Sequence, residues 1–223
     1  MVRTQPSLDL TIIDAASLFD ACEVIAERLG RSKVTLDYSE LRRRLDLLRT
    51  AAGWRPASLS SVLLSIDPAS EGQKRFQLML RHSGFEPDVL HYRDTFVSVP
   101  PGRSPNEMTG KPIVSFAPRI AYIAGLFARH PDPHFLVVCH SFELYGPLMD
   151  LARRVSTGKV GLAYFGSLLD YRWKAAGLFD GPDEGAPHIH FFDLDPFGKE
   201  LIGVDLSGGP SATSDVRSGL NRF

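Results

Sequence analysis

Cysteine is scarce in this chain, which has two thiols, Cys22 and Cys139, among 223 residues. Two cysteines cannot build the disulfide framework of a small secreted domain, and both lie within predicted strands or helices. We therefore expect them to be reduced, buried thiols. An excess of charge is also missing, because 25 Lys and Arg face 26 Asp and Glu, for a formal net charge of -1. Binding to nucleic acid or anionic lipid would therefore need a local patch.

Long apolar runs and glycine-rich loops are missing as well. Asp9 and Asp14 interrupt the apolar residues near the start, so we expect neither a signal peptide nor a membrane span. A cytoplasmic protein without a membrane partner is the default expectation. The first predicted strand is not followed by a glycine-rich phosphate loop, and this counts against a nucleotide-binding, flavodoxin-like module.

Apolar strands alternate with amphipathic helices along most of the chain. This alternation predicts one α/β domain over residues 1–195, a three-layer sandwich with a mostly parallel central sheet. The stretch 196–223 is rich in Gly, Ser and Asp, and it predicts a poorly ordered polar tail. The clearest predicted strands are "LDLTIID" (8–14), "SSVLLSID" (60–67), "FLVVC" (135–139) and "KVGLAYFG" (159–166).

Several segments carry a family resemblance. "DAASLFDA" follows the first strand, "LDYSELRRRL" opens a helix, and "SVLLSIDPASEGQKRFQLMLRHSGFEP" forms a strand and a helix that ends before Gly-Phe. "LVVCHSFELYGPLMDLARRVSTGKVGLAYFG" adds a strand, a turn, a helix and a further strand. In this order they resemble the NYN family of the PIN-like nuclease superfamily over roughly residues 8–195. The resemblance implies a PIN-like (NYN) architecture.

Such nucleases hold Mg²⁺ or Mn²⁺ on carboxylates at the carboxyl ends of adjacent parallel strands. Hard divalent ions prefer oxygen ligands, and the bound ion activates water and neutralises charge on the attacked phosphate. The resemblance implies that Asp14 is the first acid and that Glu143 is the remaining acid of the fourth strand–turn–helix. Both would be metal ligands and catalytic residues only if the chain is active.

Other family positions carry residues that suit substrate better than metal. Ser17 stands where the family has Asn, and Lys111 falls where it has a Lys-Gly-Val-Asp stretch. Arg119 lies near another expected carboxylate, and Ser141 lies in the turn where two aspartates are replaced. The resemblance therefore implies substrate binding for these four residues and a degenerate metal site.

These substitutions favour a pseudoenzyme, a non-cleaving module that binds RNA or a protein partner. A homo-oligomer is also compatible with the sequence. The alternative is a divergent Mg²⁺- or Mn²⁺-dependent endoribonuclease, helped by a further acid such as Asp67 or Asp94. A simpler interpretation also stands for each candidate acid. Asp14 would then only cap the following helix, and Glu143 would be a solvent-facing residue in the first turn of another.

Two further motifs allow other interpretations. "VCHSFE" resembles the nucleophile elbow of α/β-hydrolases, with Ser141 as nucleophile followed by Asp170 or Asp180 and then His188. The elbow needs small residues two positions on either side of the serine, and here a cysteine and a glutamate occupy them. His188 and His190 alternate in a predicted strand, a spacing that suits a metal ion as well as a half-buried sheet. Two arginine runs, 42–44 and 153–154, are expected to be solvated helix faces.

Overall fold

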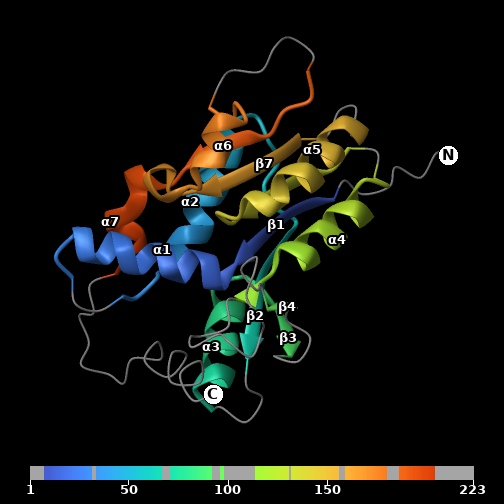
Figure 1. Cartoon of the computed structure of the whole chain (residues 1–223). Helices are drawn as coiled ribbons and strands as arrows, with labels where there is room; N and C mark the ends of the chain where they lie inside the picture. Colours follow the sequence, from blue (N-terminus) through green and yellow to red (C-terminus); the bar gives the residue numbers. More distant parts are fainter. Residues whose placement is uncertain are drawn as a thin grey trace.

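A six-stranded parallel sheet forms the centre of the molecule, in the order β3-β2-β1-β6-β7-β8 (Figure 1). The computed structural model describes residues 8–31, 34–66, 71–91, 96–97, 114–130, 132–155, 159–179 and 186–203. Helices cover both faces of the sheet, so the predicted three-layer α/β sandwich is confirmed. The strands are β1 (Asp9–Asp14), β2 (Leu59–Ile66), β3 (Glu86–His91), β6 (His134–Val138), β7 (Lys159–Tyr164) and β8 (His190–Asp193).

The helices divide between the two faces. Phe127 of α4 packs on Phe135 of β6, with ring centroids 5.4 Å apart, and α5 lies beside α4 (Figure 1). Arg49 of α2 reaches Thr11 of β1 from the opposite face. Within the described residues, no helix has the length and apolar character needed to cross a bilayer. The helices are α1 (Ala15–Arg28), α2 (Tyr38–Ala51), α3 (Glu71–His82), α4 (Ala117–Phe127), α5 (Tyr145–Arg154), α6 (Tyr171–Ala175) and α7 (Gly198–Leu201); β4 (Phe96–Val97) and β5 (Val114–Ser115) form a separate antiparallel pair.

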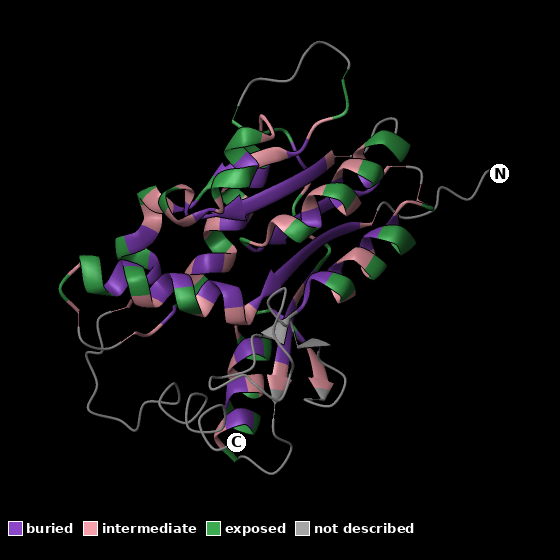
Figure 2. Ribbon diagram, viewed as in Figure 1, coloured by how far each residue is buried: buried purple, intermediate pink, exposed green. Residues whose placement is uncertain are grey.

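The sequence pattern explains the burial of the sheet. Every residue of β1 and of β6 is buried, as expected for apolar strands covered by helices on both faces (Figure 2). The outer faces of the helices are exposed, because their apolar residues recur at helical spacing. Asp37 caps α2 by accepting a hydrogen bond from the Glu40 amide at 2.9 Å.

A polar network closes the amino-terminal edge of the sheet. The Arg49 side chain is fully buried, and its guanidinium donates to the carbonyl oxygens of Leu10 and Arg55 and to Thr11 Oγ1 at 2.9–3.1 Å. Burial lowers the pKa of Arg49 to about 10, so the group stays charged at neutral pH. Arg55 in turn contacts the buried Asp9 at 3.0 Å. The network leaves the opposite, carboxyl-terminal edge as the open end of the sheet.

The described fold continues past Asp195, although sequence analysis placed the start of the tail at residue 196. The backbone N–H of Asp37 donates to the carbonyl oxygen of Leu201 at 2.8 Å, and Ile202 pairs with Leu36 in an antiparallel bridge. Leu201 and Ile202 are fully buried. The described fold therefore extends to residue 203, because these apolar residues, set in a polar stretch, belong to the core beside α2. Residues 204–223 lie outside the described residues.

Candidate functional site at the carboxyl ends of β1 and β6

The two central strands of the sheet, β1 and β6, mark the point where the strand order reverses. In open α/β sheets, ligands bind in the crevice outside the carboxyl ends of such strands. Ile13 pairs with Val138, so Asp14 and Cys139 follow at the same edge, one residue further along. Five side chains meet there and are called the switch-point cluster: Asp14, Ser17, Cys139, His140 and Tyr164.

Asp14 is the buried centre of this cluster, with 5% of its surface exposed. One carboxylate oxygen accepts a hydrogen bond from the Ser17 amide at 2.9 Å, which caps α1. The other oxygen lies 3.4 Å from Cys139 Sγ, whose thiol is the donor. Burial raises the pKa of Asp14 to about 6, and the hydrogen bonds from the amide and the thiol offset only part of that rise. Asp14 is thus the N-cap of α1 and at the same time a member of the switch-point cluster.

Ser17 links the first turn of α1 to the turn after β6. Its Oγ accepts a hydrogen bond from the His140 amide at 3.1 Å and lies 2.5 Å from His140 Nδ1. When the neutral ring carries its proton on Nε2, Ser17 donates to Nδ1; in the other tautomer Nδ1 donates to Ser17. Partial burial lowers the pKa of His140 below its ordinary value, which favours that neutral ring. Tyr164 also donates to the Ser17 carbonyl oxygen at 2.7 Å. Ser17 therefore holds His140 in place.

Glu143 and Ser141 lie in the turn after β6. Glu143 is exposed on η3 (Phe142–Leu144). The pKa of Arg172 in α6 is raised mainly by its hydrogen bond with Asp170, and the charge of Glu143 adds a smaller contribution. The Ser141 amide donates to Cys139 Sγ at 3.4 Å. Asp14, the other predicted metal ligand, forms hydrogen bonds with Ser17 and Cys139, and neither of these residues belongs to η3. Over the described part of the chain, no three His, Cys, Asp or Glu side chains gather in a way that could hold a metal ion.

Arg119 contacts an acid outside the switch-point cluster. Its Nη2 and Nε donate to Asp88 Oδ2 at 3.0 and 3.2 Å. Asp14, Leu63 and Asp88 lie in register across β1, β2 and β3, so the Arg119–Asp88 pair is separated from Asp14 by the strand that carries Leu63. Other residues considered from the sequence lie outside the described residues: Lys111, Asp67, Asp94 and Asp180.

The hydrolase interpretation of Ser141 is inconsistent with the register of the sheet. Gly161 of β7 pairs with Leu136 on one side and with His190 on the other. Ser141 comes five residues after Leu136, and His188 two residues before His190. Ser141 follows the carboxyl end of β6 and His188 precedes the first residue of β8, so the two residues lie at opposite edges of the parallel sheet. Ser141 and His188 therefore cannot form a nucleophile–base pair.

An aromatic group borders the switch-point cluster on the side of α6. Phe142 stacks on Tyr145, with ring centroids 5.2 Å apart and an interplanar angle of 9°. Trp173 is fully buried against the edge of Phe142 at 5.3 Å, and its indole nitrogen donates to the His140 carbonyl oxygen at 3.0 Å. The Arg172 guanidinium lies 5.1 Å from the centre of the Phe142 ring. This aromatic group fixes the turn that carries His140.

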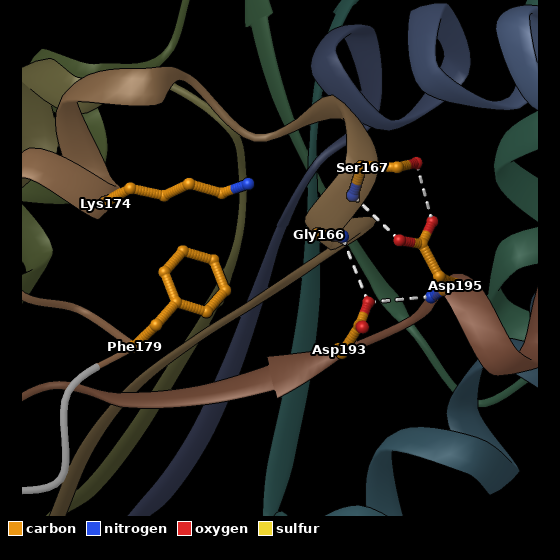
Figure 3. A pocket seen from close by; sticks show the side chains of 6 residues that line it. All are labelled: Gly166, Ser167, Lys174, Phe179, Asp193 and Asp195. Carbon is orange, nitrogen blue, oxygen red and sulfur yellow. Dashed lines mark hydrogen bonds between the residues drawn. The ribbon is translucent and has the colours of Figure 1, made fainter.

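A shallow hollow of about 500 Å³ lies at the carboxyl ends of β7 and β8 (Figure 3). Asp193 Oδ1 accepts from the amides of Gly166 and Asp195 at 3.0 and 2.9 Å. Asp195 accepts from the amide and hydroxyl of Ser167 at 2.7 and 2.9 Å. Lys174 and Phe179 line the other side of the hollow (Figure 3). The two carboxylates thus tie η4 (Gly166–Leu168) to the segment that follows β8.

Sequence reasoning singled out Asp14 and Ser17 but gave no role at this site to Cys139, His140 or Tyr164. The missed signal is positional. Cys139 and His140 directly follow β6, Tyr164 ends β7, and both strands lie on the same side of β1 in the sheet. In a parallel sheet, residues that end neighbouring strands meet at one edge.

Comparison with known proteins adds no family. No protein-family model matches the sequence, and no curated protein matches it. Parallel α/β sheets support many unrelated activities, so the architecture alone does not specify one. The chemistry of the switch-point cluster and its border carries the functional argument.

Proposed function

We propose that this chain is a PIN-like, NYN-type domain that does not cleave RNA and acts as a binding or regulatory module. The observation that carries the proposal is the environment of Asp14. Its two oxygens contact the Ser17 amide and the Cys139 thiol, and burial raises its pKa. Mg²⁺ and Mn²⁺ need several oxygen ligands, usually with more than one carboxylate. A thiol and an imidazole stand at this position instead, so the residues do not fit a hard divalent ion.

The charges at this edge favour a protein partner over RNA. Affinity for RNA comes largely from Lys and Arg that neutralise phosphates. Here Arg119 is paired with Asp88 at 3.0 Å and Arg172 with Asp170 at 2.6 Å. The arginine runs of α2 and α5 likewise contact acids on their own helices. A phosphate backbone would have to break these pairs before it gained new ones.

Exposed aromatic side chains at the same edge support a protein contact. Tyr171 is 76% exposed at the start of α6, and Phe179, 45% exposed, lines the hollow beside it. Lys174 extends over the Phe179 ring at 5.5 Å. Tyrosine and phenylalanine are enriched at the centres of protein interfaces, where a ring buries a large area with little loss of rotamer freedom.

A cleavage assay tests the loss of nuclease activity. The full chain is incubated with single-stranded and structured RNA in the presence of Mn²⁺, beside Asp14→Asn and a matched control, Asp20→Asn, on the exposed side of α1. We expect no cleavage from any of the three proteins. Mn²⁺-dependent cleavage that is lost in Asp14→Asn but kept in Asp20→Asn would refute the proposal.

Fluorescence anisotropy with the same RNAs tests the class of partner. Binding should be no tighter than the roughly 10⁻⁴ to 10⁻⁶ M typical of nonspecific charge attraction. A photo-reactive residue is then placed at Tyr171, and at Leu47 on α2 as a second exposed position for the control. We expect a protein adduct in cells at position 171 only. Adducts with RNA at position 171, or equal protein adducts at both positions, would contradict a protein-binding edge.

A further inference from the structure

Two histidines lie next to each other at the start of β8, on the edge of the sheet opposite the switch-point cluster. The ring centroids of His188 and His190 are 4.1 Å apart, and the ring planes are inclined by 59°. Both side chains are partly exposed. Trp54, which is 3% exposed, contacts the His190 ring edge-to-face at 5.3 Å. The pair is therefore accessible to solvent on one side and supported by the core on the other.

We propose that His188 and His190 together bind a divalent transition-metal ion of the late first row, with water completing its coordination. Imidazole nitrogen suits copper, nickel and zinc, and the general order of affinities places Cu²⁺ above the other two. Metal–nitrogen bonds of about 2.0–2.1 Å require the two nitrogens to lie about 3 Å apart. With ring centres 4.1 Å apart, the two imidazoles are close enough for one ion to contact both.

The surroundings of the pair orient both rings before an ion arrives. When His188 Nδ1 carries the proton, it faces the Ala186 carbonyl oxygen at 3.4 Å, and this leaves the lone pair on Nε2. A metal-binding histidine commonly donates its second ring nitrogen in this way. The backbone of His190 is fixed by its pairing with Gly161 in β7, and its ring is supported by Trp54. Little ordering is left for the metal to impose.

The charge of Lys159 sets a limit on the affinity. Its ammonium group donates to the carbonyl oxygen of Gly53 at 2.8 Å, and its charge acts on His190. A positive charge next to the pair repels a divalent cation. No third His, Cys, Asp or Glu joins the pair within the described residues, so water fills the remaining positions. Hard ions such as Mg²⁺ and Mn²⁺ gain little from two nitrogens and are expected not to bind.

Titration of the full chain with Cu²⁺, without any added histidine tag, tests the proposal. Binding is followed by calorimetry and by electron paramagnetic resonance, which reports the nitrogens bound to the copper. His188→Ala removes the more accessible ring, while His190→Phe keeps a ring against Trp54 without a ligating nitrogen. His82→Ala, at an exposed position on α3, is the control.

We expect one bound Cu²⁺ with a two-nitrogen signal in the wild type and in His82→Ala. Each of the two site variants should weaken binding at least about tenfold, because a chelate becomes a single-ligand contact. Lys159→Gln should tighten binding, since it removes the repelling charge. Wild-type affinity in His188→Ala and His190→Phe, or a loss of binding in His82→Ala, would overturn the proposal. Because the pair lies far from Asp14, its failure leaves the proposed function unaffected.

Discussion

Replacing Asp14 with Asn should remove a pH-dependent penalty from the fold. Burial raises the pKa of Asp14 from 3.8 to about 6, so the folded protein holds this proton more tightly than the unfolded chain. Stability contributed by protonated Asp14 is full below pH 3.8 and is lost as the pH rises toward 6. At about 1.36 kcal/mol per pKa unit, ionisation weakens the fold by about 3 kcal/mol. Asn carries no charge and still caps a helix well.

Urea unfolding of the wild type and Asp14→Asn at several pH values measures this penalty. The difference in unfolding free energy between the two proteins should shift in favour of Asn by about 2 kcal/mol between about pH 4.5 and pH 8. Comparing differences removes the contributions of all other titrating groups that the two proteins share. Glu27→Gln, which changes an exposed carboxylate near the other end of the same helix, should show a nearly constant difference from the wild type.

A constant difference between wild type and Asp14→Asn across this pH range would refute the reasoning. It would mean that Asp14 is as well solvated, or as well compensated by cations, in the folded protein as in the unfolded chain. A second refuting result would be a difference that favours the wild type more strongly as the pH rises. That sign would indicate a positively charged partner for the ionised carboxylate, such as a bound metal ion.

Three other substitutions test the packing and charges. In Gly161→Ala, the new Cβ would lie 2.8 Å from Trp54 Cη2, so we expect a loss of about 1–3 kcal/mol in urea unfolding and altered tryptophan fluorescence. Arg49→Leu leaves the buried acceptors that now bind the guanidinium without a donor. The free energy of unfolding should therefore fall by about 3 kcal/mol or more in thermal and chemical unfolding. Asp88→Asn breaks a partly exposed pair with Arg119 and should cost under about 1 kcal/mol by urea unfolding. A larger effect in the last variant would indicate a role beyond a surface ion pair.

The fold was predictable because a strand that is buried on both faces has a continuous run of apolar residues. The apolar runs around Ile12 and Val137 predicted covered parallel strands, and the segment "LDYSELRRRL" predicted the start of α2. The C-terminal boundary was not predictable in the same way. Leu201 and Ile202 are isolated apolar residues in a polar stretch, and their burial depends on α2, which is distant in sequence.

The site was only partly predictable, since its contacts join segments far apart in the chain. Asp14 could be proposed from its place at a strand end, whereas its contact with Cys139 spans 125 residues. The Ser17–His140 contact spans 123 residues and depends on β1 and β6 being neighbours. Arg119 was predicted to bind substrate, and its contact with Asp88 depends on where α4 crosses the sheet. Sequence gives the chemistry of these groups, and strand order decides which of them meet.

The bridge between Leu36 and Ile202 has a consequence for synthesis on the ribosome. The segment before α2 gains its backbone partners only from Leu201 to Gly203, near the end of the described chain. Domains begin to fold as they emerge during translation. Here the segment before α2 must wait for these partners until the chain has been made as far as Gly203. A nascent chain stopped before residue 201 would leave this segment open to chaperones and proteases.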